Sequence, residues 1–311
     1  MTEQKTLKGA VRLRGVGLHT GGVVELELRP AEPDSGVVFV RTDLLGSNGG
    51  SARVEARVER LGSRPRRTAL VQGPAEVHTT EHLLAALCAA GVHNVEVRLN
   101  APELPGLDGS ALPFYEAIRS VGTDTQGVPP PEVRVSEPVL AQEPGEHGAW
   151  IAAIPCPEGF RISYTLDYSR LASAMGVSPA VRALATQYFD VLVTEETFAR
   201  EIAPARTFVF EHEVRQLRAE GLGKGANTQN TLVLGKDGIL ENSLRFPDEF
   251  VRHKILDMIG DLYLLGAQPL GRFVAAKSGH ALNVLVAKQI SSPDALAVGR
   301  AVRESLSWNA R

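Results

Sequence analysis

The same succession of elements occurs once in each half of the chain, and this repeat constrains the fold more than any other feature of the sequence. In the first half, the Ala/Leu-rich run TTEHLLAALCAAG predicts a helix that ends at Gly91, a strand follows over 94–100, and DGSAL leads into another helix. In the second half, an apolar helix ends at Gly266, a strand follows over 272–277, and SGHAL leads into another helix. We infer two copies of one α+β unit.

Composition indicates where the two copies are joined. A chain of 311 residues is about twice the size of a common domain. Alternating apolar and polar residues predict antiparallel strands, such as 23–30 and 36–43. The segment 123–131, TDTQGVPPP, suits a linker because its prolines can continue neither a helix nor a central strand. We therefore predict domains over 1–126 and 133–311, with a ligand site in the cleft between them if their helix layers pack together.

The overall composition excludes several classes of protein. A hydrophobic content of 43% and a mean hydropathy of -0.05 are ordinary for a globular protein, and no apolar run is long enough to be an integral membrane segment. The N-terminus, MTEQKTLKGA, lacks the features of a signal or transit peptide, so we expect a cytoplasmic protein. Cys88 and Cys156 are too few for a disulfide framework. The net charge of -3 argues against nucleic-acid binding, and nothing indicates an obligate protein partner.

The helix around 252–266, RHKILDMIGDLYLLG, carries the strongest chemical signal. His253, Asp257 and Asp261 are spaced four residues apart, so they share one stripe of the helix. The other faces are apolar, which indicates that the stripe is buried and needs partners. Imidazole and carboxylate groups at this spacing suit zinc, and the remaining acid could orient a ligand. A buried network of ion pairs is the alternative for this helix alone.

A second signal is the sequence His78-Thr79-Thr80-Glu81-His82, which leads into an apolar helix. One interpretation is the inverted zinc-peptidase motif H-x-x-E-H, in which both histidines bind zinc from one helix. The other takes Thr79 as the N-cap, which leaves His78 outside the helix and unable to share a face with His82. We favour the second interpretation, in which Glu81 could accept a proton from an attacking water beside a ligating histidine.

Two further segments are less specific. Lys277-Ser278-Gly279-His280 lies between a predicted strand and a helix, where a lone histidine is more often structural than catalytic. The stretch GVGLHTGG at 15–22 has Thr20 where a dinucleotide-binding fingerprint requires its last glycine, so we interpret it as a turn.

Six motifs occur in one order along the chain: GVGLHTG, the T-x-E-H-L helix start, NAPELPGLDGSALPF, ARTFVF, RFPDEFVRHKILDMIGDL and KSGHALN. With these motifs the chain resembles the UDP-3-O-acyl-N-acetylglucosamine deacetylases, the LpxC family, from about Thr6 to Gln289. The resemblance implies a cytoplasmic, zinc-dependent enzyme of lipid A synthesis that hydrolyses the acetamide of a UDP-linked, 3-O-acylated glucosamine. It also implies two β-α-α-β sandwich domains with the active site between their helix layers.

The resemblance assigns chemical roles to residues at matching motif positions. It implies that Glu81 is the general base, that His280 stabilises the oxyanion as an imidazolium and protonates the leaving amine, and that Asp261 holds the His280 ring. Thr207 would donate a hydrogen bond to the tetrahedral intermediate, and Lys254 would lie near the diphosphate or the scissile amide. The implied zinc ligands are His82, His253 and Asp257.

Substrate binding is implied for four more residues, which are Phe208, Phe210, Tyr164 and Lys277. The helix around 212–220 and the run GLGKGAN would form a hydrophobic passage for the acyl chain. His19 and Asp108 lie in family motifs without an assigned role. The chain departs from the family pattern at Val209, where glycine is usual, and at Ser163-Tyr164, where Asp-Phe is expected, so we expect different uridine contacts.

Two other functions remain as alternatives to this deacetylase. The first is a zinc peptidase that uses His78, Glu81 and His82. The second is a catalytically inactive protein that binds a sugar nucleotide and whose acidic helix is only structural.

Overall fold

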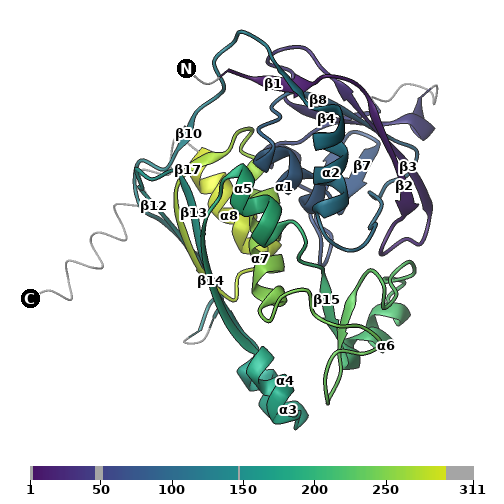
Figure 1. The fold of residues 1–311 in the computed structure, drawn as a ribbon, viewed down its shortest axis with the longest axis vertical. Helices are drawn as coiled ribbons and strands as arrows, with labels where there is room; N and C mark the ends of the chain where they lie inside the picture. The colour runs from purple at the N-terminus through teal and green to yellow at the C-terminus, as the bar shows by residue number, and fades with distance from the viewer. Residues whose placement is uncertain (1–2, 46–51, 146–147, 292–311) are drawn as a thin grey trace, which may run out of the picture.

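The computed structural model describes residues 3–45, 52–145 and 148–291, so the outer ends of both predicted domains, 1–2 and 292–311, lie outside the described residues. Two β-sheets form opposite sides of the molecule, and helices from both halves of the chain lie between them (Figure 1). Within the described residues, no helix combines the length and apolar character needed to cross a membrane.

The first sheet is built from the N-terminal half of the chain. Its strands are β2 (Val11–Val16), β3 (Val23–Pro30), β4 (Val37–Arg41), β5 (Arg53–Glu55) and β8 (Val95–Leu99). Their order is β2-β3-β8-β4-β5, with β4 and β8 parallel and the other neighbours antiparallel.

The second sheet repeats this topology. Its strands are β10 (Val133–Arg134), β11 (Val139–Gln142), β12 (Trp150–Ile154), β13 (Phe160–Asp167), β14 (Thr186–Leu192) and β17 (Pro269–Ala276). The order is β11-β12-β17-β13-β14, in which β13 and β17 are again the parallel pair, and the short β10 is added beside β17, also in parallel. The matching order and directions confirm the predicted α+β fold with a duplicated unit.

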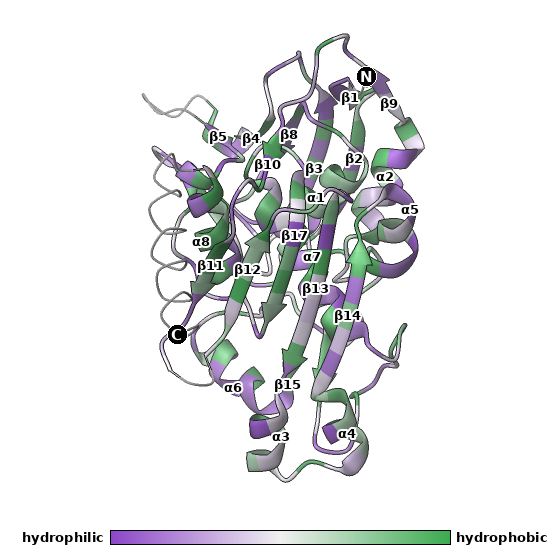
Figure 2. Cartoon of the chain, turned by 90° about the vertical axis from the view of Figure 1, so that its left-hand side faces the viewer, coloured by the Kyte–Doolittle hydropathy of each residue, from purple (hydrophilic) through white to green (hydrophobic). Residues whose placement is uncertain are grey.

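Each sheet buries one face against the helices. Along β17, buried residues alternate with half-buried ones, as the two-residue period of a strand requires. Figure 2 shows the second sheet from its outer side, where hydrophobic and hydrophilic residues are interspersed along the strands. The buried face therefore positions the helices, and the outer face of β17 is partly exposed.

Two helices from each copy form the middle of the molecule. They are α1 (Glu81–Ala89), α2 (Leu112–Val121), α7 (Glu249–Tyr263) and α8 (His280–Ser291). α1 packs directly against α7, with α2 beside α1 and α8 beside α7. At Gly260 the two helices are in close contact, because an added Cβ would lie 2.0 Å from the Glu81 carbonyl oxygen. Only glycine at position 260 allows α1 and α7 to approach this closely.

The repeat extends to single residues. α1 and α7 are followed by Gly91 and Gly266, both at positive φ, as the glycine that follows a helix often is. Counting back nine residues from each glycine gives His82 in the first copy and Asp257 in the second. Two predicted zinc ligands therefore occupy equivalent positions in the two copies.

Short elements connect the repeated units, and some of them differ between the copies. The first copy contains the hairpin β6 (Ala69–Gln72) and β7 (Ala75–His78) and the 3-10 turns η1 (Thr42–Leu44) and η2 (Val58–Arg60). The second contains α3 (Ser169–Met175), α4 (Pro179–Leu184), α5 (Glu195–Thr197), the π-helical turn η3 (Phe198–Ile202), β15 (Phe208–Phe210), α6 (Glu211–Ala219) and β16 (Leu232–Leu234).

Part of the predicted linker is ordered as a strand. β9 (Thr123–Thr125) pairs with β1 (Lys5–Leu7) in an antiparallel ladder. The prolines of this segment follow β9, where no ladder hydrogen bond is needed.

Candidate active site and metal centre

Three side chains that could hold a metal ion meet where α1 packs against α7. They are His82, His253 and Asp257, and one donor atom from each falls within 4.8 Å of the others. His253 Nε2 lies 3.4 Å from Asp257 Oδ1, and His82 Nε2 lies 3.8 Å from the same oxygen. The two imidazole rings are nearly perpendicular, at 86°. Two imidazoles and one carboxylate at these distances fit a metal site.

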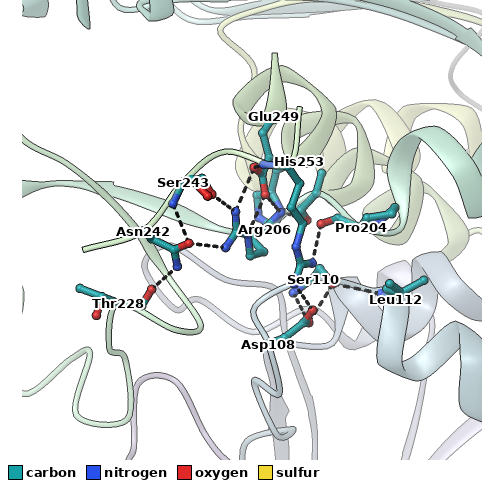
Figure 3. A network of polar contacts seen from close by, with 12 residues as sticks. Asp108, Ser110, Leu112, Pro204, Arg206, Thr228, Asn242, Ser243, Glu249 and His253 are labelled. Atoms are coloured by element: carbon teal, nitrogen blue, oxygen red, sulfur yellow. Dashed lines mark hydrogen bonds and ion pairs between the residues drawn. The ribbon is translucent and has the colours of Figure 1, made fainter. Parts of the chain in front are cut away.

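The ring of His253 is oriented by the chain segment that precedes β15. Its Nδ1 lies 3.1 Å from the carbonyl oxygen of Ala205, which leaves Nε2 free to face Asp257. Arg206, the next residue, is held by Glu249: its backbone nitrogen and its Nε both donate to Glu249 Oε1, at 3.0 and 2.8 Å (Figure 3). This buried ion pair fixes the peptide that orients His253.

The protonation states of these groups suit a metal site. Burial lowers the pKa of His82 to about 3, so its imidazole is neutral and can act as a ligand. Burial alone would raise the pKa of Asp257, but Lys254 and the surrounding histidines hold it well below its usual range. Lys254 Nζ donates to Asp257 Oδ2 at 2.8 Å, which leaves Oδ1 toward the two histidines.

Glu81 lies beside the metal ligands at the first position of α1. Its Oε2 accepts a hydrogen bond from the backbone nitrogen of Thr68 at 3.1 Å. Burial raises the pKa of Glu81 to about 7, and Asp257 and Asp261 also raise it while His280 opposes them. A carboxylate with this pKa can accept a proton near neutral pH.

The start of α1 differs by one residue from the sequence prediction. Thr79 is not the N-cap, because the helix begins at Glu81 after Thr80, and Thr79 adopts a φ of 58°. The Thr79 hydroxyl instead donates to the buried Glu103 at 3.1 Å. His78 lies in β7, outside the helix as predicted, with its Nε2 3.4 Å from Glu76.

His280 faces the metal ligands from the start of α8. Its Nδ1 lies 2.9 Å from Asp261 Oδ2, and its Nε2 lies 4.0 Å from Asp257 Oδ2. Burial favours the neutral ring, but Asp261 and Asp257 outweigh it and raise the pKa of His280 to about 9. His280 is therefore a cation at neutral pH, with Nε2 directed toward the site.

Asp261 is held by three neighbours and is completely buried. Its Oδ1 accepts a hydrogen bond from the Thr68 hydroxyl, and its Oδ2 accepts one from Asn283 Nδ2 at 2.9 Å as well as facing His280. The carboxylate is thus fixed from two segments, α8 and the residue before β6.

A cavity of about 530 Å³ joins these groups to the surface. Glu81, the three candidate metal ligands, Lys254 and His280 all line it. Thr207, Phe208 and Phe210 line the same cavity, so the structure brings these predicted site residues together. His19 also lines it, and burial with the nearby Arg67 lowers the pKa of His19 to about 4.

An apolar groove of about 200 Å³ continues from this cavity beneath α6. Val214 and Leu217 of α6 form one side. The other lining residues include Leu18, Leu222 and Val233. The groove shares Thr207, Phe208 and Val209 with the larger cavity, so one ligand could occupy both.

Two of the predicted substrate-binding residues are placed elsewhere. Tyr164 is buried in β13, and its hydroxyl donates to the backbone carbonyl of Ser278. Lys277 follows β17 at a φ of 58°, near Asp167, whose pKa it helps to lower. Asp108, which had no assigned role, pairs with Arg245 at 2.9 Å and joins the two copies (Figure 3).

Sequence reasoning missed the residues that support the site through hydrogen bonds. Thr68 and Asn283 hold Asp261, and Ala205 acts through a carbonyl group, which any residue could supply. Glu103 accepts hydrogen bonds from the backbone nitrogens of His19 and Thr20, at 2.9 and 2.7 Å. None of these contacts follows from a spacing along one helix, because each joins segments that are distant in the sequence.

Comparison with known proteins gives consistent matches along most of the chain. The family model described as UDP-3-O-acyl N-acetylglycosamine deacetylase matches residues 4–292. The UDP-3-O-acyl-N-acetylglucosamine deacetylase of Thermosynechococcus vestitus is 42% identical over 290 residues, which cover 93% of this chain and 94% of that protein. The protein of the same name from Saccharophagus degradans is 40% identical over 286 residues, which cover 91% of this chain and 88% of that protein.

Proposed function

Because the chain belongs to the UDP-3-O-acyl-N-acetylglucosamine deacetylase family, we propose that it is a zinc-dependent amide hydrolase of lipid A biosynthesis. Its substrate is a UDP-3-O-(hydroxyacyl)-N-acetylglucosamine, and its products are the free amine and acetate. We place this activity in the cytoplasm, as the sequence resemblance implies. The observation that carries the proposal is the meeting of His82, His253 and Asp257 beside Glu81 and His280 in one cavity.

The residues present fit the proposed metal. His82 Nε2, His253 Nε2 and Asp257 Oδ1 would hold it, since they are close together, buried and in the protonation states that ligation requires. The hydrogen bond between His253 Nδ1 and the Ala205 carbonyl supports the assignment, because ligating histidines usually donate their other nitrogen in this way. A bound zinc ion would supply Lewis-acid activation of the scissile carbonyl.

The protein's own groups account for the proton transfers. Glu81 takes a proton from the attacking water, because its raised pKa makes it a base near neutral pH. His280 Nε2, protonated at that pH, stabilises the charge that develops on the carbonyl oxygen and gives its proton to the leaving amine. Asp261 holds Nδ1 of that ring, so Nε2 faces the cavity. Acid–base catalysis needs one group that accepts a proton, here Glu81, and one that donates a proton, here His280.

The cavity and groove match the two ends of the proposed substrate. Cationic side chains at the cavity, Arg64, Arg66 and Lys254, suit a diphosphate. The apolar groove beneath α6 suits the acyl chain, and its continuity with the cavity would let the sugar lie over the metal ligands.

Direct measurement of acetate release from a UDP-3-O-acyl-N-acetylglucosamine tests this function. We expect release by the zinc-loaded protein and loss of release after chelation, with recovery when zinc is added back. Zinc-loaded protein that releases no acetate from this substrate class would overturn the proposal and favour the inactive, sugar-nucleotide-binding alternative. Cleavage of peptides instead would favour the peptidase.

A further inference from the structure

Thr68 contacts both sides of the proposed proton-transfer machinery. Its backbone nitrogen donates to Glu81 Oε2 at 3.1 Å, and its hydroxyl donates to Asp261 Oδ1. The same hydroxyl oxygen lies 3.3 Å from His280 Nδ1. Thr68 is buried, with 2% of its surface exposed. One residue of the first copy thus joins the base of that copy to the acid of the second.

The position of Thr68 is itself fixed by the β6–β7 hairpin. It directly precedes β6, and its carbonyl oxygen accepts a hydrogen bond from the backbone nitrogen of Thr79 at 2.9 Å. Thr79 lies two residues before Glu81 and is held by Glu103. The hairpin therefore holds Thr68 at a set distance from the start of α1.

The hydroxyl of Thr68 completes the set of hydrogen bonds to the Asp261 carboxylate. Oδ2 of this carboxylate is already shared by His280 and Asn283, at 2.9 Å each. The Thr68 hydroxyl is the donor on Oδ1, and it prevents the carboxylate from rotating about its own axis. A carboxylate with a buried, unsatisfied oxygen would reorient toward another donor and turn the His280 ring with it.

We propose that Thr68 is a positioning residue that aligns His280, through Asp261, with Glu81. The proposal rests on the deacetylase function, because it assigns His280 and Glu81 their acid and base roles. The hydrogen-bonding partners of Thr68 at the site are Glu81, Asp261 and His280 and include none of the candidate metal ligands, so it acts through its neighbours. Its contribution should therefore appear in turnover and not in metal binding.

Thr68→Val and Thr68→Ser separate the hydroxyl from the shape of the side chain. Valine keeps the volume and the backbone N–H but loses the donor to Asp261, whereas serine keeps the donor. We expect Thr68→Val to lower kcat by about 10- to 100-fold, with KM and zinc content close to the parent values, as for other residues that orient a catalytic group. Thr68→Ser should retain most of the parent kcat.

Thr6→Val is the matched control. The Thr6 hydroxyl is also buried and donates to the Asn94 carbonyl at 2.7 Å, but it lies in β1, away from the site. This variant should lose thermal stability without a change in kcat. A parent-like kcat for Thr68→Val, or an equal loss in Thr68→Ser, would overturn the proposal.

A second measurement is independent of turnover and separates this proposal from the proposed function. The imidazole ¹⁵N resonances of His280, identified by their absence in His280→Gln, report the environment of its ring. We expect them to shift in Thr68→Val and to stay near the parent values in Thr68→Ser and Thr6→Val. Unchanged resonances in Thr68→Val would overturn the positioning role even if the protein releases acetate. Shifted resonances in a protein that releases none would support the positioning role and reject only the deacetylase function.

Discussion

His82 and Asp257 show how a duplicated fold can produce a site that is not symmetric. They occupy equivalent positions on α1 and α7, yet one supplies an imidazole and the other a carboxylate. The same divergence occurs in the segments that lead into α2 and α8, where Leu107 and Lys277 both have positive φ and are followed three residues later by Ser110 and His280, respectively. Each copy keeps the backbone, and single substitutions provide different chemistry.

Replacing Glu81 by alanine should separate catalysis from metal binding. We expect Glu81→Ala to retain zinc, because the carboxylate is not one of the three clustered donors, and to lose about 10²- to 10⁴-fold in kcat, the usual contribution of a general base. Acetate release and zinc analysis on one preparation measure both effects. Glu116→Ala, on the exposed side of α2, is the control. A Glu81→Ala protein with near-parent turnover would exclude Glu81 as the base.

The pH dependence of kcat/KM should be bell-shaped. Activity should rise with pH as Glu81 loses its proton, and fall at higher pH as His280 loses its own, since their pKa values are about 7 and about 9. A bound dication lowers both pKa values, so the prediction compares the pH profile of a variant with that of the parent protein. Asp261→Asn removes the charge that raises the pKa of His280, so the alkaline limb should move to lower pH. A limb that stays in place would show that another group titrates there.

At the scale of residues, the sequence predicts which side chains could carry the chemistry but not which residues hold those side chains in place. The four-residue spacing of His253, Asp257 and Asp261 correctly indicates a shared, buried stripe of one helix. Thr79 illustrates the limit, because its side chain suits an N-cap but its backbone is left-handed and its hydroxyl serves Glu103. The tertiary hydrogen bond to Glu103 outweighed the preference of threonine for an N-cap position. Such a bond cannot be predicted from a local sequence pattern.

At the scale of elements, the crossing of α1 and α7 positions the site. α1 contributes Glu81 and His82, and α7 contributes His253, Asp257 and Asp261. The two helices touch where Gly260 faces the Glu81 backbone. Their separation therefore sets the distance between donors from the two copies.

Gly260→Ala should widen this crossing. The new methyl group would meet the Glu81 carbonyl at a distance that requires the helices to move, and overpacking of this kind costs about 1–3 kcal/mol of the free energy of unfolding. We expect a lower Tm and weaker zinc binding, measured by thermal unfolding and by competition with a chelator. Gly9→Ala, where an added Cβ meets nothing within 4 Å, should change neither quantity. Parent-like zinc affinity in Gly260→Ala would show that the crossing does not control the site.

The repeat of elements was predictable because each copy marks its helix end with glycine and its next helix with an Ala-Leu pair. The linker was less predictable, because Thr123–Thr125 form β9 through pairing with a strand more than a hundred residues earlier. Local composition correctly predicts that the prolines after β9 do not form a helix or a central strand, but it carries no information about a distant partner strand.

At the scale of the whole molecule, the candidate site belongs to both copies and the apolar groove to segments that differ between them. α6 and the chain around 222–228 form the groove in the second copy, and Leu18 closes it from the first. The topology repeated in the two copies thus positions the candidate site, and we propose that the segments that differ between them select the ligand.

Leu217→Gln should impair substrates with long acyl chains selectively. Each buried methylene contributes about 0.8 kcal/mol, so a polar group in the groove should lower kcat/KM for a long-chain substrate by about tenfold or more. The effect should disappear when the acyl chain is too short to reach α6. Arg215→Ala, an exposed position on the same helix, is the control. Equal losses for long and short chains would place the acyl chain elsewhere.

The most direct test of a metal centre shared by the two copies is the zinc content of purified variants. We expect His82→Ala, His253→Ala and Asp257→Ala each to lose the bound zinc of the parent protein, because every one of them removes a donor from the cluster. His78→Ala should keep it, since His78 lies in β7 beside Glu76. Near-stoichiometric zinc in His253→Ala together with its loss in His78→Ala would contradict the shared centre.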